Sequence, residues 1–219
     1  VAQSETMEKL VLPIGQELAM GHYFIELEAN PVVELAMSEY SYTGAVTSIK
    51  EPNHDPAHVD YATGFVKEFD WVVTQGCLCF EADCEQEAFG AENVTNGYTR
   101  PYQMSNIWHS DGDINQWIKL SWNKKQTISN IKLFFDSNLN RYCKASDKDN
   151  KDLFYRMVKD YVIYYKDENG NRCLLCEVEN NFQRVNELSF EPINTDEIYM
   201  ELKKTHGQPF YSVYEIRCY

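Results

Sequence analysis

Two histidines four residues apart, His54 and His58, are the first candidates for metal or acid–base chemistry in this chain. Histidines at this spacing aim at one metal ion when a helix carries them. Pro52 precedes the pair and Pro56 divides it, and proline removes a helical hydrogen bond and clashes with the preceding turn. We therefore predict a solvated loop here and no metal centre.

Seven cysteines could act as metal ligands or form disulfides, but their number and context favour neither. An odd count argues against a complete disulfide framework. Two close pairs resemble zinc knuckles, yet both lie in apolar, strand-like sequence, whereas a zinc site places paired cysteines on a turn near a second pair. We expect mostly buried free thiols, and the redox compartment stays open. The cysteines are Cys77, Cys79, Cys84, Cys143, Cys173, Cys176 and Cys218.

The sequence lacks the motifs that several enzyme classes require. No two glycines have the G-x-G spacing of a dinucleotide-binding turn, and neither G-x-S-x-G nor H-E-x-x-H occurs. A glycosidase needs two carboxylates across a cleft, and the 34 acidic residues supply pairs without a distinguishing motif. We predict that the chain is not an enzyme, with an unrecognised glycoside hydrolase as an alternative.

Aromatic and basic side chains in predicted loops are the candidates for ligand binding. A sugar site needs an aromatic ring for stacking and an arginine or histidine that hydrogen-bonds hydroxyl groups. The residues that meet this description are Tyr98, Arg100, Tyr102, Phe182, Arg184, His206 and Tyr211. The alternative for each is structural, because the arginines could pair with nearby carboxylates and the rings could cap a core.

Strand-like runs separated by turn residues must position these candidates. Short stretches alternate apolar and polar residues while helical periodicity is weak, so we predict an all-β sandwich. Asn169 and Gly170 are the strongest turn signal, because this pair suits a type I′ hairpin. Short helices are expected at residues 5–10 and 83–89. The expected strands are residues 23–28, 33–37, 65–73, 77–81, 116–122, 128–135, 160–165, 173–178, 187–190, 198–202 and 213–218.

Length and charge bound the organisation and the partners. The 219 residues suit two small domains, and we predict a small β-sandwich-like domain at residues 1–88 and a larger sandwich at residues 89–219. The net charge of −14, without a basic run, argues against nucleic acid as a partner. No apolar stretch is long enough to span a membrane. The N-terminus has no signal-peptide pattern, so a signal peptide is expected to be absent or trimmed.

The larger predicted domain resembles the discoidin, or coagulation factor 5/8 type C, family. This resemblance implies a jelly-roll-like, galactose-binding-like sandwich. Trp108 and Trp117 match positions that pack inside the family's sandwich, so both are expected in the core. The matching segments are residues 93–97, 105–110, 116–120, 128–133 and 212–219.

Family members bind glycans, phospholipid surfaces or protein receptors through loops at one end, and some hold a structural calcium beside an aspartate–glycine turn. Here Asn96 replaces that aspartate before Gly97. Because calcium prefers charged oxygen ligands, the resemblance makes calcium possible but doubtful, with Asp111, Asp113 or carbonyls near Tyr98 as remaining ligands. No other cofactor is expected.

Residues 96–102 and 205–211 are similar to the discoidin-type region appended to some FAD-dependent oxidoreductases of glycan-degrading gut bacteria. This narrower resemblance implies a secreted bacterial protein, periplasmic or extracellular, whose partner is a glycan or the rest of a parent enzyme. We therefore expect a non-catalytic, carbohydrate-related binding module. The alternative is a structural docking domain of a larger oxidoreductase, with no ligand of its own.

Overall fold

The computed structural model describes residues 9, 11–19, 21, 23–28, 30–38, 47–52, 69–73, 76–81, 87–102, 104–112, 116–138 and 154–219. The chain divides into two compact units, Val1–Asn30 and Pro31–Tyr219. The domain boundary expected between residues 88 and 89 stays a prediction. Within the described ranges, no helix has the length and apolar character needed to cross a bilayer.

A two-stranded sheet is formed by β1 (Ser48–Pro52) and β2 (Phe69–Val73), paired antiparallel from Ser48 opposite Val73 to Pro52 opposite Phe69. It contains the end of the strand predicted at residues 65–73, whose first four residues lie outside the described ranges. Of the strand predicted at residues 77–81, only Leu78 pairs, in an isolated bridge with Met37.

The strands predicted at residues 23–28 and 33–37 do not form, apart from an isolated bridge at Met37. In the first of these segments Tyr23, Ile25 and Leu27 are all exposed. Alternation produces a strand only where another strand supplies hydrogen-bond partners, and the structure gives this segment none among the residues it describes. The helix predicted at residues 5–10 lies outside the described ranges, while the segment at 83–89 ends in the 3₁₀ turn η1 (Glu87–Phe89).

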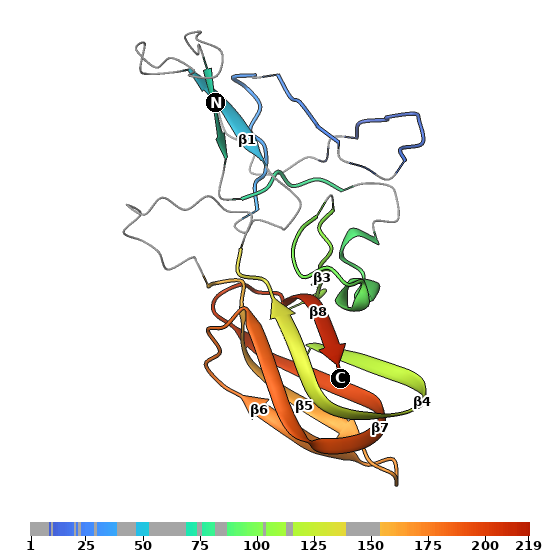
Figure 1. Cartoon of the computed structure of the whole chain (residues 1–219). Helices are drawn as coiled ribbons and strands as arrows, with labels where there is room; N and C mark the ends of the chain where they lie inside the picture. Colours follow the sequence, from blue (N-terminus) through green and yellow to red (C-terminus); the bar gives the residue numbers. More distant parts are fainter. Residues whose placement is uncertain are drawn as a thin grey trace, which may run out of the picture. The chain divides into compact units, whose positions relative to one another are not determined.

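Six strands form the main antiparallel sheet, in the order β3-β8-β4-β7-β5-β6 (Figure 1). A second 3₁₀ turn, η2 (Ala91–Thr95), precedes it. This architecture confirms the predicted all-β class. The strand bounds are β3 Trp108–His109, β4 Gln116–Phe135, β5 Val158–Lys166, β6 Arg172–Val178, β7 Val185–Thr205 and β8 Ser212–Cys218.

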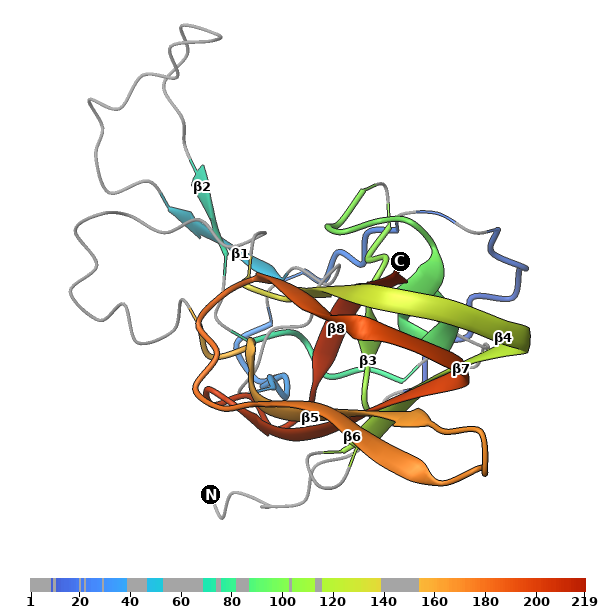
Figure 2. The ribbon, with the colours of Figure 1, turned by 60° about the horizontal axis from the view of Figure 1, so that its bottom comes forward.

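The two longest strands, β4 and β7, carry the sheet through both layers of a sandwich. Residues 116–121 of β4 pair with residues 197–202 of β7, whose other edge pairs with β5. After a register shift between Ser121 and Gln126, residues 131–135 of β4 pair with β8 as well as with β7. Figure 2 shows both strands curving from one layer into the other. Such shifts bend a strand and let one sheet close over itself.

The core lies between these layers. Inward positions alternate along the strands, as the period of two requires. Each large apolar side chain removed from water contributes about 1.5–3 kcal/mol, so this cluster dominates the stability of the sandwich. Its most buried members include Ile131, Leu133, Phe135, Tyr161, Ile163, Met200, Leu202 and Val213.

The β5–β6 connection confirms the predicted hairpin but not its turn type. A type I′ turn needs a positive φ at both central residues, whereas only Gly170, at φ +83°, has one. Residues 167–171 form a longer loop, closed by a 2.9 Å hydrogen bond from Asp167 N to Asn171 O. The Asp167 carboxylate also accepts from the backbone N–H groups of Asn169 and Asn171, which competes with the tighter turn.

Candidate ligand-binding site

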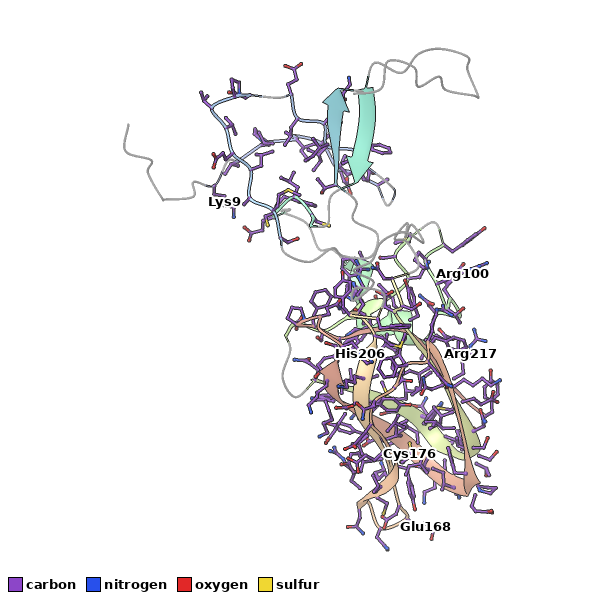
Figure 3. All side chains as sticks on the ribbon, turned by 90° about the vertical axis from the view of Figure 1, so that its left-hand side faces the viewer. Lys9, Arg100, Glu168, Cys176, His206 and Arg217 are labelled. Carbon is purple, nitrogen blue, oxygen red and sulfur yellow. The ribbon has the colours of Figure 1, made fainter. Side chains whose placement is uncertain are left out.

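The predicted binding residues lie mainly at one end of the sandwich. Figure 3 places Arg100 and His206 toward one end of the β sandwich and Glu168, in the β5–β6 turn, at the opposite end. The loops that carry them follow η2, precede β7 and follow β7. Six of the seven predicted residues form two groups there, connected through the segment that leads into β7.

The first group is a stacked pair of tyrosines. The rings of Tyr98 and Tyr102 lie 5.8 Å apart at 16°, and the residues are 44% and 56% exposed. With Arg100 they line a hollow of about 260 Å³. The structure therefore brings three predicted residues together in one solvent-facing depression.

The turn before these tyrosines is held from β8. Gly97, at φ +89°, donates its N–H to the Glu215 carboxylate at 2.9 Å and accepts a hydrogen bond from Arg217 at 3.1 Å. Few residues other than glycine adopt this backbone conformation without strain. The Asn96 side chain accepts the Tyr98 N–H at 2.8 Å, which closes the turn.

Arg184 joins the segment before β7 to this loop. Its guanidinium donates to the carbonyl of Thr99 and lies 6.0 Å from the Tyr214 ring. Burial lowers the pKa of Arg184; the nearby positive charge of Arg100 acts in the same direction, whereas Tyr214 and Asp136 oppose it. Arg184 therefore positions the loop and also contributes positive charge to its surroundings.

The second group is built around Phe182 and His206, whose rings lie 4.4 Å apart. The imidazole Nε2 lies 2.6 Å from the Asn181 carbonyl, and Phe154 packs edge-on against Phe182. Asn180 adopts a positive φ of 54° just before this contact. Phe154 is half-exposed and was missed by the sequence reading, because it lies outside any strand or motif.

Tyr211, in contrast, lies in the core and is only 2% exposed. Its backbone exchanges two hydrogen bonds with Ser110, one to the Ser110 hydroxyl at 2.9 Å and one from the Ser110 N–H at 3.0 Å. A ring without solvent-facing surface cannot stack on a ligand, so Tyr211 lies outside the candidate site.

The two carboxylates in the contacts described above are paired with arginines. Asp136 pairs with Arg156 at 3.3 Å in a fully buried pair, and Glu215 pairs with Arg217 at 3.1 Å. Arg100 and Arg184 form no ion pair with the residues that the structure describes, and their roles in binding stay a prediction.

The turn at Gly97 does not fit calcium. Its carbonyl is occupied by the Arg217 guanidinium, and the Asn96 side-chain oxygen is engaged by a backbone N–H. The Glu215 carboxylate binds the same guanidinium, which puts a positive charge where a cation would need ligands. No group of three or more histidine, cysteine or acidic residues that could hold a metal occurs in the described ranges, outside which Asp113, His54 and His58 lie.

The described cysteines are free thiols, but only Cys77 is buried, Cys79 is exposed and the other three are half-buried, so the expectation of mostly buried thiols is wrong for this part of the chain. Burial raises the pKa of the Cys218 thiol to about 12 and also raises the pKa of Cys176. Both thiols therefore ionise less readily than a free cysteine. Cys84 and Cys143 lie outside the described residues.

Trp117 is the largest correction to the predicted core. Trp108 packs against the core as expected, but Trp117 is 52% exposed on the outer face of β4. The neighbouring Ile118 is buried, and the period of two along a strand sends residue 117 to the opposite face. The alternation of apolar and polar residues at 116–122 predicts an exposed ring at Trp117, whereas the family resemblance predicts a buried one.

No protein-family model and no curated protein matches this chain. Several solved structures are similar to this chain. The family 32 carbohydrate-binding module of EndoD from Streptococcus pneumoniae is 20% identical, with a TM-score of 0.49 over 63% of this chain and 90% of that one. The family 32 module of NanJ from Clostridium perfringens, in complex with galactose, is 18% identical, with a TM-score of 0.45 over 62% and 88%.

A chitosan-binding module of a chitosanase/glucanase from Paenibacillus sp. IK-5 is 17% identical, with a TM-score of 0.46 over 61% of this chain and 87% of that one. The predicted link to FAD-dependent oxidoreductases stays a prediction.

Proposed function

We propose that this chain is a non-catalytic carbohydrate-binding module that holds a sugar at the loop end. The observation that carries the proposal is the exposed stack of Tyr98 and Tyr102 beside Arg100, over a hollow of about 260 Å³. The C–H face of a pyranose ring is apolar and packs on an aromatic face, while its hydroxyls need donors such as a guanidinium. The hollow combines both requirements.

The charge of this end favours an acidic sugar, such as a uronic acid. Arginine forms short, bidentate hydrogen bonds with a carboxylate, and the exposed guanidinium of Arg100 has no ion-pair partner in the described residues. The partly buried charge of Arg184 adds to the local positive potential. A neutral sugar would give the Arg100 guanidinium no anionic group to bind.

The two carboxylates described at the loop end do not support a catalytic role. A glycosidase needs one carboxylate on each side of the scissile bond. Both carboxylates in the contacts described above, Asp136 and Glu215, are buried and paired with arginines. These two carboxylates are therefore not placed as a glycosidase pair, which supports a binding role for this end.

Docking to a parent enzyme is the second candidate, and exposed apolar side chains near the N-terminus favour it. Apolar patches of this kind commonly mark interfaces. In this reading residues 11–27 would contact the rest of a larger protein, and the loop end would bind no sugar. The exposed side chains are Val11, Leu12, Ile14, Leu18, Tyr23, Phe24, Ile25 and Leu27.

Isothermal titration of the purified chain with trigalacturonic acid and with galactose tests the proposal. We expect saturable binding of the acidic trisaccharide and a loss of about tenfold or more in affinity for Tyr98→Ala and for Tyr102→Ala. Tyr219→Ala is the matched control, because Tyr219 is equally exposed but lies at the end of β8. Absence of sugar binding, or full affinity in both tyrosine variants, would favour the docking role.

The contribution of the Arg100 charge to binding can be tested in the same titration. Arg100→Gln should lower affinity for trigalacturonic acid about tenfold or more, while Lys132→Gln, which removes an exposed charge on β4, should leave it unchanged. If Arg100→Gln loses no affinity, the site selects sugars by stacking alone.

A further inference from the structure

The first half of β4 has an unpaired edge in the described part of the chain. Residues 117–121 pair with β7 on one edge, whereas the pairing of β4 with β8 begins only at Ile131. No other strand among the described residues pairs with this stretch, which therefore borders its layer of the sandwich (Figure 1). Alternate residues of a strand turn their N–H and C=O groups to opposite edges, so about half of these groups point away from β7.

A hollow of about 670 Å³ follows this edge. It is lined by six consecutive residues of β4, 117–122, together with parts of β3, η2 and the end of β8. Consecutive residues of a strand point their side chains to opposite faces. The Trp117 ring, for example, stacks on Tyr199 on the outer face, with centroids 5.4 Å apart. A hollow that borders all six residues therefore runs along the edge of the strand and reaches the space between the two layers.

The inner wall of this hollow is apolar. Ile118, Leu120 and Trp122 line it from the inward side of β4, and the last two are only half-buried. Trp108 and Cys218 line it from β3 and β8, and both are half-buried as well. In a β-sandwich the inward side chains of the two layers cover each other. At this edge the cover is incomplete, so apolar surface stays accessible to a further strand.

The edge and the wall together define the chemistry of the partner. The N–H and C=O groups of a strand edge recur at a fixed spacing, which another extended polypeptide matches. When a strand is added to a sheet, these backbone bonds supply affinity and pockets for alternate side chains supply specificity. The hollow lies within the range of about 300–1,000 Å³ typical of ligand sites, and its apolar wall selects apolar side chains.

We propose that residues 117–121 of β4 are a docking edge for an extended segment of a partner protein, with an apolar side chain at every second position. The segment would pair with the backbone of β4, and its apolar side chains would enter the hollow beside η2. This hollow shares no lining residue with the one at the loop end. The proposal is therefore independent of sugar binding, and a sugar and a partner segment would not compete.

Fluorescence anisotropy of the full chain with labelled, end-blocked heptapeptides Lys-X-Thr-X-Thr-X-Lys tests the proposal, where X is Val, Leu or Phe. We expect at least one peptide to bind with a Kd below about 1 mM. Two analogues of that peptide carry N-methyl groups, one on the Thr nitrogens and the other on the X nitrogens. Only one analogue should lose affinity, by about tenfold or more, because only one set of N–H groups faces β4.

A substitution that fills the hollow tests the same site from the other side. Ala91 is exposed in η2 and lines the hollow, so Ala91→Trp should lower the affinity for the peptide about tenfold or more. Ala36→Trp is the matched control, because Ala36 is also exposed but does not line the hollow. Thermal unfolding of both variants verifies that they fold. In amide hydrogen exchange, bound peptide should slow the amides of residues 117–121 that face away from β7.

The other outcomes would overturn the proposal. They are no binding by any of the three peptides up to about 1 mM, equal affinity of the two methylated analogues, or full affinity in Ala91→Trp. Slow exchange of every amide of residues 117–121 in the free chain would mean that another segment of the chain already occupies the edge. Sedimentation examines the remaining occupant, since a dimer that the peptide dissociates would assign the edge to a second copy in place of a partner protein.

Discussion

The loop end and the outer face of β4 both present aromatic rings beside arginine, but they differ in what the arginine does. On the outer face, Arg172 stacks on Tyr199 and pairs with Glu201, so its charge is used within the protein. At the loop end, Arg100 has no carboxylate partner in the described residues, so its charge is available to a ligand. Whether an arginine is already paired with a carboxylate of the protein therefore determines which ligand a site selects, more than the presence of the arginine does.

The two regions also differ in how their rings are held. Tyr98 and Tyr102 sit on a turn whose geometry depends on Gly97, Glu215 and Arg217. Trp117 lies near the start of the β4–β7 ladder, and its ring stacks on Tyr199 of β7. We therefore expect the loop end to depend on buried polar contacts and the outer face to be insensitive to them.

The largest expected effect is on the buried pair beside the loop end. Arg156→Ala leaves Asp136 charged and buried without its partner, so the free energy of unfolding should fall by about 3–5 kcal/mol in urea denaturation. On the outer face, Lys119→Ala removes an exposed pair with Glu197 and should cost at most about 1 kcal/mol. Equal costs would contradict the contrast between the regions.

Acid should weaken the sandwich through His109, which lies between the rings of Phe89 and Phe210. Burial, aided by the charge of Arg156, lowers its pKa to about 3. Because the folded pKa is depressed, the unfolded chain binds the proton first, and stability falls as the pH drops below about 6.5.

The loss reaches about 1.4 kcal/mol per pH unit, or about 2 kcal/mol between neutral pH and about pH 5. His109→Gln should remove this part of the pH dependence. Urea denaturation of both proteins at the two pH values measures it. An unchanged slope in the variant would assign the acid sensitivity to other groups.

Alanine substitutions at two glycines distinguish an effect on stability from an effect on ligand binding. Gly97 and Gly170 both have a positive φ and open space where a Cβ would lie, so each substitution by alanine should cost about 1 kcal/mol of backbone strain. Only Gly97→Ala should also weaken binding of trigalacturonic acid, because Gly170 lies in the opposite hairpin. Titration and thermal unfolding of both variants test this, and equal binding would remove the turn from the site.

Salt should produce the smallest effect. Raising ionic strength from about 0.01 M to about 1 M shortens the screening length from about 30 Å to about 3 Å. Affinity for trigalacturonic acid should fall several-fold in the unmodified chain and hardly change in Arg100→Gln, because the guanidinium supplies the charge that salt screens. An equal salt dependence in both proteins would remove Arg100 from the site.

Much of the sandwich could be predicted from the sequence, since every strand of the main sheet except β3 overlaps a predicted segment, although β4 and β7 were each predicted as two shorter strands. Alternation of apolar and polar residues is a local property of the sequence, and the core strands show it. Residues 23–28 alternate in the same way but form no strand, because a strand also needs a pairing partner. The sequence does not reveal which segments lack such a partner.

The candidate site was predictable in part. Tyr98, Arg100 and Tyr102 are close in sequence, so a loop of that composition brings them together. Arg184 and Thr99 are 85 residues apart, and their contact depends on the register of β7, which no local pattern contains. Trp117 and Tyr199 likewise meet only once β4 and β7 have paired, so the stacked rings on the outer face could not be predicted.

The continuity of β4 and β7 also determines how this protein unfolds. Because each strand contributes hydrogen bonds to both layers, neither layer can separate without breaking the ladder of the other (Figure 2). Amide hydrogen exchange should therefore give the amides of residues 117–120 and 131–134 of β4 that bond to β7 the same opening free energy, that of global unfolding. The sandwich then behaves as a single cooperative unit, and a ligand bound at the loop end raises the protection of both.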